Sequence, residues 1–398
     1  MAELTFEDLS FKDEKENIKI YFLRIFYFYI PKKELEAIGK FSIEENSIKF
    51  EDMPQNKAER KFYKLLEVGF KKLKNSLNNK PAVYIHKNSG IPLIGNVAFG
   101  LVDRDTNIIE VKPITSCNLK CVYCSVDEDK RPVDFVVEKD YLVEEFRKIV
   151  EFKSIDGIEA HIASQGEPLF YAPLTELVRD LSKIKQIKTI SIDTNGMMLT
   201  KNKVDELVQA GLTRFNFSIN SLDDKLAIRI AGAGYNLKNT IEVCRYIAKK
   251  ANLIIAPVLI PGMNEQEMPK IIGFAKELKA DIGIQNFLNY RLGRNPVKQM
   301  DFEIFYKKLE EWQEIYKIKL IKSEQDFNII KTKALPKPFR KGEIIEAEVV
   351  CNGRLKNEKI AVASQRTISV PNCQKEKGKI KLKITRTKHN IFIGIPLS

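Results

Sequence analysis

The stretch Ile114-Thr-Ser-Cys-Asn-Leu-Lys-Cys-Val-Tyr-Cys-Ser125 places three cysteines, Cys117, Cys121 and Cys124, in the spacing C-x3-C-x2-C. Three thiolates this close in sequence can each bind one iron of a four-iron cluster, which leaves the fourth iron open to a ligand from outside the protein. A structural zinc site normally takes four protein ligands, and no nearby Cys or His completes such a set. The spacing therefore favours an iron–sulfur cluster over a zinc knuckle.

Around this stretch, from residue 109 to residue 288, segments of strand and helix character alternate with short connections. Parallel neighbours in a sheet need helical crossovers of this kind, and the crossovers wind right-handed. We therefore expect an α/β fold, a partial (β/α)6 barrel of six parallel strands. The expected strands are Ile109–Ile114, Ile158–Ser164, Thr189–Thr194, Arg214–Ile219, Leu253–Ile260 and Ile282–Phe287, and the expected helices are Lys139–Phe152, Pro173–Ile184, Lys201–Ala210, Leu237–Lys250 and Gln266–Leu278.

Short polar motifs follow these strands at their carboxyl ends, where ligands bind in parallel sheets and barrels. They are Ser164-Gln-Gly-Glu-Pro168, Asp193-Thr-Asn-Gly196, Ser218-Ile-Asn220 and Val258-Leu-Ile-Pro-Gly-Met-Asn264. Each motif is weak by itself, because an Asn-Gly or Pro-Gly pair is commonly no more than a turn. Their shared position downstream of the three cysteines makes the set specific.

The cysteine spacing, with Tyr123 before the last cysteine, and the four strand-end motifs resemble the radical S-adenosylmethionine (SAM) family. The resemblance implies the partial barrel, a [4Fe-4S] cluster on Cys117, Cys121 and Cys124, and cleavage of SAM to a 5′-deoxyadenosyl radical. Gln165 departs from the family pattern, in which a glycine is usual. The cofactor-binding residues that the resemblance implies are Tyr123, Gly166, Glu167, Pro168, Thr194, Asn195, Ser218, Asn220, Pro261 and Gly262, and no catalytic residue is identified.

Residues 1–108 are expected to form an N-terminal α/β extension, whose role the sequence does not indicate. Lys19–Ile30 is rich in β-branched and aromatic residues, which predicts one long strand. Asn56–Leu77 carries apolar residues at helical spacing. Two apolar runs on either side of Asp103–Asn107 predict a hairpin.

The end of the chain, beyond a radical SAM core at 109–290 and a linker helix region at 291–332, is strongly basic. Residues 331–398 hold 16 Lys and Arg against 5 Asp and Glu, so they carry +11 of the net charge of +13. This asymmetry indicates a separate module that meets a polyanion, whereas a lysine-rich surface of the thermophilic kind is the plainer explanation. Five short strands expected within 333–398 predict a small β-barrel of the OB type.

The segments Lys341–Val350, Ile368–Cys373 and Lys377–Thr385 resemble the TRAM domain, an RNA-binding β-barrel attached to several tRNA- and rRNA-modifying enzymes. The glycine-rich run usual after its first strand is thinner here, with only Asn352-Gly-Arg354. Alternate lysines on one expected strand would project from the same face toward phosphates. The RNA-binding candidates are Arg366, Lys379, Lys381, Lys383 and Arg386. Surface salt bridges are the plainer role for the two arginines.

These resemblances predict a radical SAM enzyme that abstracts hydrogen from a nucleoside of tRNA or rRNA. An electron donor such as a ferredoxin or a flavodoxin would be a further partner. Methylthiolation through a second cluster is disfavoured because residues 1–116 contain no cysteine. Cobalamin-dependent methylation is unsupported because the sequence contains no Asp-x-His-x-x-Gly motif. The alternative is a glycyl-radical activase or a peptide-modifying enzyme. A binding protein with a merely structural cluster is a third possibility.

Six cysteines, three of them in the motif, do not make a disulfide framework, which indicates a reducing, cytoplasmic setting. Cys244, Cys351 and Cys373 are expected to be single buried thiols, whereas a Cys351/Cys373 pair could hold part of a second cluster. No apolar run approaches the length of a membrane span, and the acidic N-terminus lacks the layout of a signal peptide. No membrane contact is therefore expected.

Overall fold

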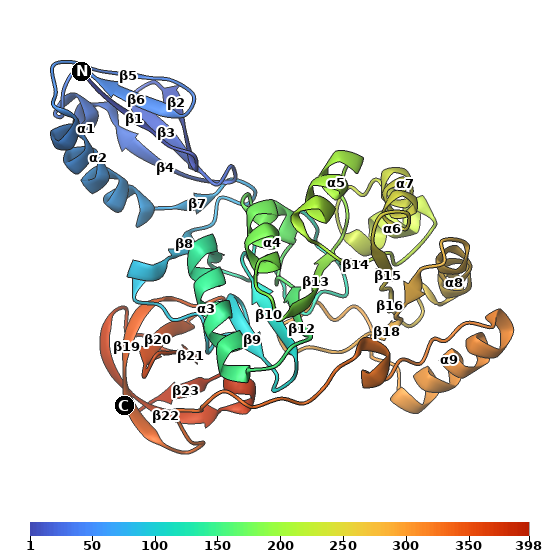
Figure 1. Cartoon of the computed structure of the whole chain (residues 1–398). Helices are drawn as coiled ribbons and strands as arrows, with labels where there is room; N and C mark the ends of the chain where they lie inside the picture. The colour runs from blue at the N-terminus through green and yellow to red at the C-terminus, as the bar shows by residue number, and fades with distance from the viewer. Residues whose placement is uncertain (398) are drawn as a thin grey trace.

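The computed structural model describes residues 1–397, which form three units along the chain (Figure 1). A mixed α/β unit of N-terminal residues lies at one end. A twisted, mostly parallel sheet with helices forms the middle, and a closed β-barrel of C-terminal residues packs against it. None of the helices in this described part has both the length and the apolarity needed to cross a bilayer.

The N-terminal unit consists of two antiparallel sheets, in the orders β1-β6-β5 and β2-β3-β4-β7, and two helices. Its core is aromatic, because Phe28, Phe50 and Phe62 are all fully buried. The bounds are β1 (Ala2–Thr5), β2 (Leu9–Glu14), β3 (Asn17–Phe22), β4 (Phe26–Pro31), α1 (Lys32–Glu36), β5 (Phe41–Ile43), β6 (Ser47–Phe50), α2 (Gln55–Phe70) and β7 (Lys74–Asn75).

The single long strand predicted over Lys19–Ile30 is wrong, because this segment belongs to the hairpin of β3 and β4. Leu23 and Arg24 have φ angles of 48° and 70°, so the chain reverses there. Neither residue is a glycine or an asparagine, the types that normally signal such a reversal. The helix predicted over Asn56–Leu77 is present and ends earlier, at Phe70.

The middle unit is a seven-stranded sheet in the order β17-β15-β14-β13-β12-β10-β9. All neighbours from β10 to β17 run parallel, and only β9 is antiparallel. The two edge strands do not pair, so the barrel is incomplete, as predicted. The strands are β9 (Gly100–Asp103), β10 (Ile108–Lys112), β12 (Ile158–Ile162), β13 (Ile187–Thr194), β14 (Arg214–Phe217), β15 (Asn252–Ile255) and β17 (Asp281–Ile282).

Helices connect successive strands of this sheet and cover its outer face (Figure 1). They are α3 (Lys139–Lys153), α4 (Leu174–Ser182), α5 (Lys201–Ala210), α6 (Asp224–Ala231), α7 (Leu237–Ile247) and α8 (Met268–Glu277). Polar side chains fix where these helices begin: Thr200 and Asp223 each accept a hydrogen bond from the backbone of the first turn of their helix. The hairpin predicted around Asp103–Asn107 is also confirmed, since β9 and β10 pair there.

Two short parallel pairings extend the middle unit. β16 (Val258–Leu259) and β18 (Gln285–Asn286) continue the lines of β15 and β17 beyond a break. β8 (Ala82–Ile85) pairs with β11 (Asp134–Val137), which joins the end of the N-terminal unit to the segment after the cysteines. Helix α9 (Phe302–Tyr316), within the predicted linker helix region at 291–332, lies to one side of the sheet (Figure 1). The 3-10 turns are η1 (Lys87–Ser89), η2 (Pro168–Phe170), η3 (Glu265–Glu267), η4 (Glu324–Phe327) and η5 (Lys388–Asn390).

The C-terminal unit is a closed barrel of five strands in the order β19-β20-β21-β23-β22, with β22 returning to β19. This confirms the five short strands and the small β-barrel that the sequence predicts. The strands are β19 (Ile344–Asn352), β20 (Lys359–Ala363), β21 (Arg366–Val370), β22 (Gly378–Arg386) and β23 (Ile393–Pro396). The barrel has an apolar core of its own, formed around Ile368, Leu382 and Phe392.

The barrel is tied to the segment that precedes β9. Backbone amides of Thr367 and Phe392 donate to the carbonyl oxygens of Ile94 and Gly95, at 2.9 and 3.0 Å. Gly95 has a φ of 130°, and a Cβ there would collide with the backbone of Thr367. The close approach therefore requires glycine, and it fixes the barrel against the middle unit.

Candidate active site

The cysteine stretch is a loop that follows β10 at the carboxyl end of the sheet. Cys117, Cys121 and Cys124 are all partly exposed and line one cavity of about 810 Å³. The backbone amides of Lys120 and Val122 donate to the end of α6, at 2.9 and 3.0 Å, so the loop is anchored between the cysteines. The sequence thus correctly places the three thiols together at the mouth of the sheet.

The segment after β12 packs directly against this loop. The amide of Glu167 donates to the carbonyl oxygen of Ser116 at 2.8 Å. A Cβ at Gly166 would collide with the carbonyl oxygens of Thr115 and Ser116, so this glycine allows the two loops to touch. The departure from the family pattern, Gln165, lies next to this contact and also lines the cavity.

The carboxylate of Glu167 is 2% exposed and accepts three hydrogen bonds from the chain. The donors are the hydroxyl of Thr194 at 2.7 Å and the amides of Asn195 and Leu169 at 2.8 and 3.2 Å. Burial raises the pKa of Glu167 to about 7, although these donors favour the ionised form. Glu167 therefore joins the loops after β12 and β13, and a direct contact between its carboxylate and SAM stays a prediction.

The other predicted cofactor residues divide into two groups. Tyr123, Gly166, Glu167, Thr194, Asn195 and Ser218 line the 810 Å³ cavity, whereas Pro168, Asn220, Pro261 and Gly262 do not. Asn220 holds the cavity residue Tyr123 in place, because its side-chain amide donates to the hydroxyl of Tyr123 at 2.9 Å. The side-chain oxygen of Asn220 accepts from the backbone amide of Val258 at 2.8 Å. The structure thus brings six of the ten to one cavity, and their contacts with SAM stay predictions.

The donor set at the cysteine loop fits an iron–sulfur cluster. Among residues 1–397, no three His, Cys, Asp or Glu side chains are grouped around a point where a single metal ion could bind. A cluster with one thiolate on each of three irons does not need such a point. Burial raises the pKa of Cys121 to about 11 and that of Cys124 to about 12, and it raises that of Cys117 as well. Ionised thiolates at these positions would need a nearby positive charge, which the irons of a cluster would supply.

Arg294, which is not among the predicted site residues, contacts the cysteine loop from the segment after β18. Its amide donates to the carbonyl oxygen of Cys124 at 3.0 Å. Its guanidinium lies 3.1 Å from carboxylate oxygens of Asp127, Glu128 and Asp129. No local motif marks this arginine, because its partners lie far away in the sequence.

Charged side chains fill the inner face of the sheet beside the cavity. The Nε2 atom of His161 lies 3.3 Å from Asp193, and its Nδ1 atom lies 2.8 Å from the hydroxyl of Ser191. Glu159 pairs with Arg214 on the same face. Although burial alone lowers the pKa of His161, Asp193 and Glu159 raise it above its ordinary value. This imidazole can therefore hold a proton beside the cavity.

A second cavity of about 540 Å³ continues from the first, with which it shares Tyr123, His161, Asp193, Ser218 and Gln285. Its far wall is apolar and comes from α9, including Phe305 and Leu309. His161 and Asp193 lie on the neighbouring strands β12 and β13. Because every second residue of a strand faces the same side of the sheet, the sequence pattern could have predicted that these two side chains share a face. Nothing in the sequence pattern indicates that this face is the inner one.

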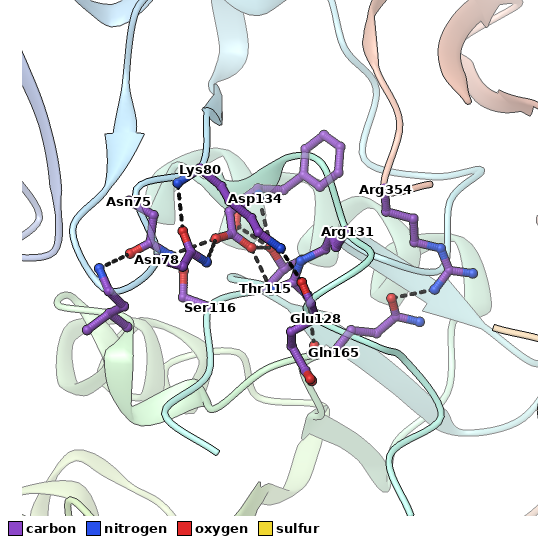
Figure 2. A network of polar contacts seen from close by, with 12 residues as sticks. Asn75, Asn78, Lys80, Thr115, Ser116, Glu128, Arg131, Asp134, Gln165 and Arg354 are labelled. Carbon is purple, nitrogen blue, oxygen red and sulfur yellow. Dashed lines mark hydrogen bonds and ion pairs between the residues drawn. The ribbon is translucent and has the colours of Figure 1, made fainter. Parts of the chain in front are cut away.

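Behind the cysteine loop, a buried polar network joins all three units of the chain (Figure 2). The carboxylate of Asp134 is fully buried, lies 2.6 Å from Arg131 and accepts from Asn75 at 2.7 Å and Thr115 at 3.0 Å. Arg131 also donates to the carbonyl oxygen of Gln165 at 3.4 Å. From the C-terminal barrel, Arg354 donates to the side-chain oxygen of Gln165 at 2.6 Å.

The RNA-binding candidates lie on the C-terminal barrel, away from the cysteines. Lys379, Lys381 and Lys383 all project outward from β22, as the alternation predicts. Glutamates of β19 lie opposite, and Glu346 pairs with Lys379 at 2.8 Å, so part of the positive charge is neutralised. Arg386 is exposed. The guanidinium of half-buried Arg366 donates to Pro336 and Asn390. RNA contact stays a prediction for all five.

The remaining cysteines are single free thiols. Cys244 and Cys373 are buried, and Cys351 is partly buried. Cys373 belongs to the core of the C-terminal barrel, whereas Cys351 packs against the larger core of the other units. This arrangement gives no support to a second cluster on Cys351 and Cys373.

A three-cysteine loop and a polar cavity at the mouth of a partial parallel barrel define the class of radical SAM enzymes. The sequence model described as "Radical SAM superfamily" matches residues 111–275, so this part of the chain is a radical SAM domain. The "Uncharacterized protein MJ0103" of Methanocaldococcus jannaschii is 40% identical over 358 residues, which are 81% of this chain and 82% of that protein.

More distant relatives share only part of the chain. The GTP 3′,8-cyclase of Listeria welshimeri is 35% identical over 194 residues, and the match covers 47% of this chain and 55% of the cyclase. The chain therefore matches about half the length of that relative. Among solved structures, SuiB of Streptococcus suis bound to S-adenosylmethionine covers 79% of this chain and 71% of its own, with 17% identity and a TM-score of 0.42.

Proposed function

We propose that the protein is a radical SAM enzyme that modifies a nucleoside of tRNA or rRNA. The observation that carries this proposal is the position of the basic C-terminal barrel. The barrel packs beside the sheet and contributes Arg354 to the wall of the cavity that holds Cys117, Cys121 and Cys124. RNA held on the barrel would therefore be bound to the same unit that contributes to the wall of the cavity.

The chain's residues have separable roles in this proposal. The three cysteines would hold a [4Fe-4S] cluster, and Tyr123, Thr194, Asn195 and Ser218 would line the space for SAM. The cluster and SAM, when bound, supply a 5′-deoxyadenosyl radical that can abstract hydrogen from a substrate. An electron donor such as a ferredoxin or a flavodoxin would reduce the cluster.

The inner face of the sheet would hold the reacting nucleoside. Its polar part offers His161, which can hold or donate a proton, and its apolar part lies against α9. Together they form a space that is polar on one side and apolar on the other, as a base with its exocyclic groups requires. The name of the cyclase relatives, GTP 3′,8-cyclase, also supports a nucleotide as the class of substrate.

The test is RNA binding by the full chain with Lys379, Lys381 and Lys383 changed to Gln, measured with bulk tRNA by gel shift at several salt concentrations. Gln removes the charges without placing new carboxylates beside Glu346. Each lost phosphate contact should reduce the log–log salt slope by about 0.7 to 0.9. The matched control changes Lys185, Lys188 and Lys249, which are exposed and lie near the amino ends of the strands, and should bind like the wild type.

Binding of tRNA that is equal in the β22 variant and the wild type would contradict the proposal. Binding of a peptide, or activation of a partner protein, in place of RNA would favour the alternative of a peptide-modifying enzyme or a glycyl-radical activase. Mass spectrometry of RNA nucleosides from cells that lack the protein would identify the product if the proposal holds.

A further inference from the structure

Arg354 lies on a tight loop between β19 and β20 of the C-terminal barrel, and its side chain lines the cavity. The amide of Gly353 donates to the carbonyl oxygen of Glu358 at 2.7 Å. The amide of Leu355 donates to the Glu358 carboxylate at 3.1 Å. A Cβ at Gly353 would collide with the Glu358 side chain, so the loop closes on itself at a glycine. This closed loop leaves Arg354 to project from the barrel into the cavity.

The guanidinium of Arg354 forms no direct ion pair with the described residues. Its one hydrogen bond among the described residues goes to the neutral amide of Gln165, and no carboxylate of residues 1–397 lies within 4.0 Å of it. A guanidinium has five N–H donors, so most of the hydrogen-bonding capacity of Arg354 is unused. Burial and, to a smaller degree, the nearby Arg131 lower the pKa of Arg354, whereas the Glu358 carboxylate of the same loop raises it.

Other cations of the cavity contrast with Arg354. Arg104 and Lys112 both pair with the carboxylate of Glu110. Arg291 resembles Arg354, because it lines the same cavity and has no carboxylate within pairing distance among the described residues, although it is more exposed. The cavity thus contains two arginines, from different parts of the chain, that have no carboxylate within 4.0 Å among residues 1–397.

We propose that Arg354, assisted by Arg291, binds an oxyanion group, a phosphate or a carboxylate, of the substrate in this cavity. Arginine is suited to this role because its planar fork matches the two oxygens of such a group. Arg354 lies outside residues 111–275, the part shared with the superfamily that binds a common cofactor. A residue from the appended barrel is therefore assigned to the substrate, which differs between enzymes.

This inference does not require that the substrate be RNA, since any phosphorylated or carboxylated substrate would satisfy it. It makes the C-terminal barrel part of the active site as well as a docking surface. Loss of tRNA binding on substitution of β22 tests the docking surface, and substitution of Arg354 tests the cavity. The two proposals can therefore fail separately.

The test measures the binding of inorganic pyrophosphate and of SAM by titration calorimetry on the reconstituted full chain. Arg354→Ala should weaken pyrophosphate binding about tenfold to a hundredfold, the range for a charge-assisted hydrogen bond, and leave SAM binding unchanged. Arg354→Lys keeps the positive charge and loses the planar fork of donors. Its affinity for pyrophosphate should therefore lie between those of Arg354→Ala and the wild type. Lys356→Ala removes an exposed charge from the same loop and should bind both ligands like the wild type.

Thermal unfolding of each variant identifies a loss of folding, and Arg354→Lys, which keeps the stem and the charge, provides the measurement if Arg354→Ala is unstable. Pyrophosphate binding that is equal in Arg354→Ala and the wild type, or absent from both, would overturn the proposal. A loss of SAM affinity in Arg354→Ala would also overturn it, because it would assign the guanidinium to the cofactor carboxylate.

Discussion

The guanidinium of Arg354 donates a 2.6 Å hydrogen bond to the side-chain oxygen of Gln165, across 189 positions of sequence. Gln165 stands where the radical SAM pattern usually has glycine, and a glycine would have no side chain to accept this bond. The departure from the pattern and the contact with the C-terminal barrel are therefore one feature. It links the loop beside the cysteines to the appended unit.

We expect the Gln165–Arg354 pair to contribute to stability as a unit. A hydrogen bond to a charged group is worth about 1.5–3 kcal/mol, so a double-mutant cycle of Gln165→Ala and Arg354→Ala should give a coupling energy of about that size. Urea unfolding of the four proteins measures it. The same cycle on Gln374 and Lys356, both exposed on the barrel, should give no coupling. Additive effects of Gln165→Ala and Arg354→Ala would show that the contact does not join the two units.

The buried pair of Arg131 and Asp134 should be the most sensitive point of the network in Figure 2. Asp134→Ala leaves the Arg131 guanidinium buried and removes the acceptor of Asn75 and Thr115. Loss of one partner of a buried pair costs about 3–5 kcal/mol, which urea unfolding should record. Glu67→Ala, which breaks an exposed pair with Lys71, is the matched control and should leave stability unchanged.

The protonation of His161 should depend on Asp193. Because Asp193 and Glu159 raise the pKa of His161 in the folded protein, the stability from this pairing is complete below the ordinary pKa of 6.5. It is lost as pH rises through the raised value. In NMR titration, Asp193→Asn should lower the pKa of His161, and the His86 resonance serves as the internal control. An unchanged His161 titration in Asp193→Asn would refute the pairing.

Iron binding should require all of the cysteines in the loop and none of the others. Anaerobic reconstitution should give about four iron and four sulfide per chain, and a Cys117/Cys121/Cys124→Ala variant should give almost none. Cys351→Ala, a partly buried thiol outside the cavity, should load iron like the wild type. Loading near eight iron per wild-type chain would instead support a second cluster and, with it, sulfur insertion as the reaction.

Much of the fold could be predicted because its signals are local. Alternating apolar periods identified the parallel strands, and the short motifs at their carboxyl ends were already in spatial order, since parallel strands bring those ends together. The five strands of the C-terminal barrel were equally clear from turn residues between short apolar runs. Cys117, Cys121 and Cys124 lie on one loop, so their meeting needed no knowledge of the tertiary structure.

What could not be predicted depends on contacts between distant parts of the chain. The hairpin at Leu23 and Arg24 lacks turn residues, so its aromatic strands appeared continuous. Arg294 and Arg354 reach the cavity only because β18 ends beside the cysteine loop and the barrel docks on the segment before β9. Arg354 was visible in the sequence as part of a thin glycine run, and nothing local connected it with Gln165.

SAM cleavage is tested most directly by the formation of 5′-deoxyadenosine and methionine from SAM by the reconstituted, chemically reduced protein. Both products should form with the wild type and neither with the Cys117/Cys121/Cys124→Ala variant. The Lys379/Lys381/Lys383→Gln variant should still form them, because the three lysines lie outside the cavity. A fully loaded wild-type protein that binds SAM and does not cleave it would contradict a radical SAM activity and favour a structural cluster.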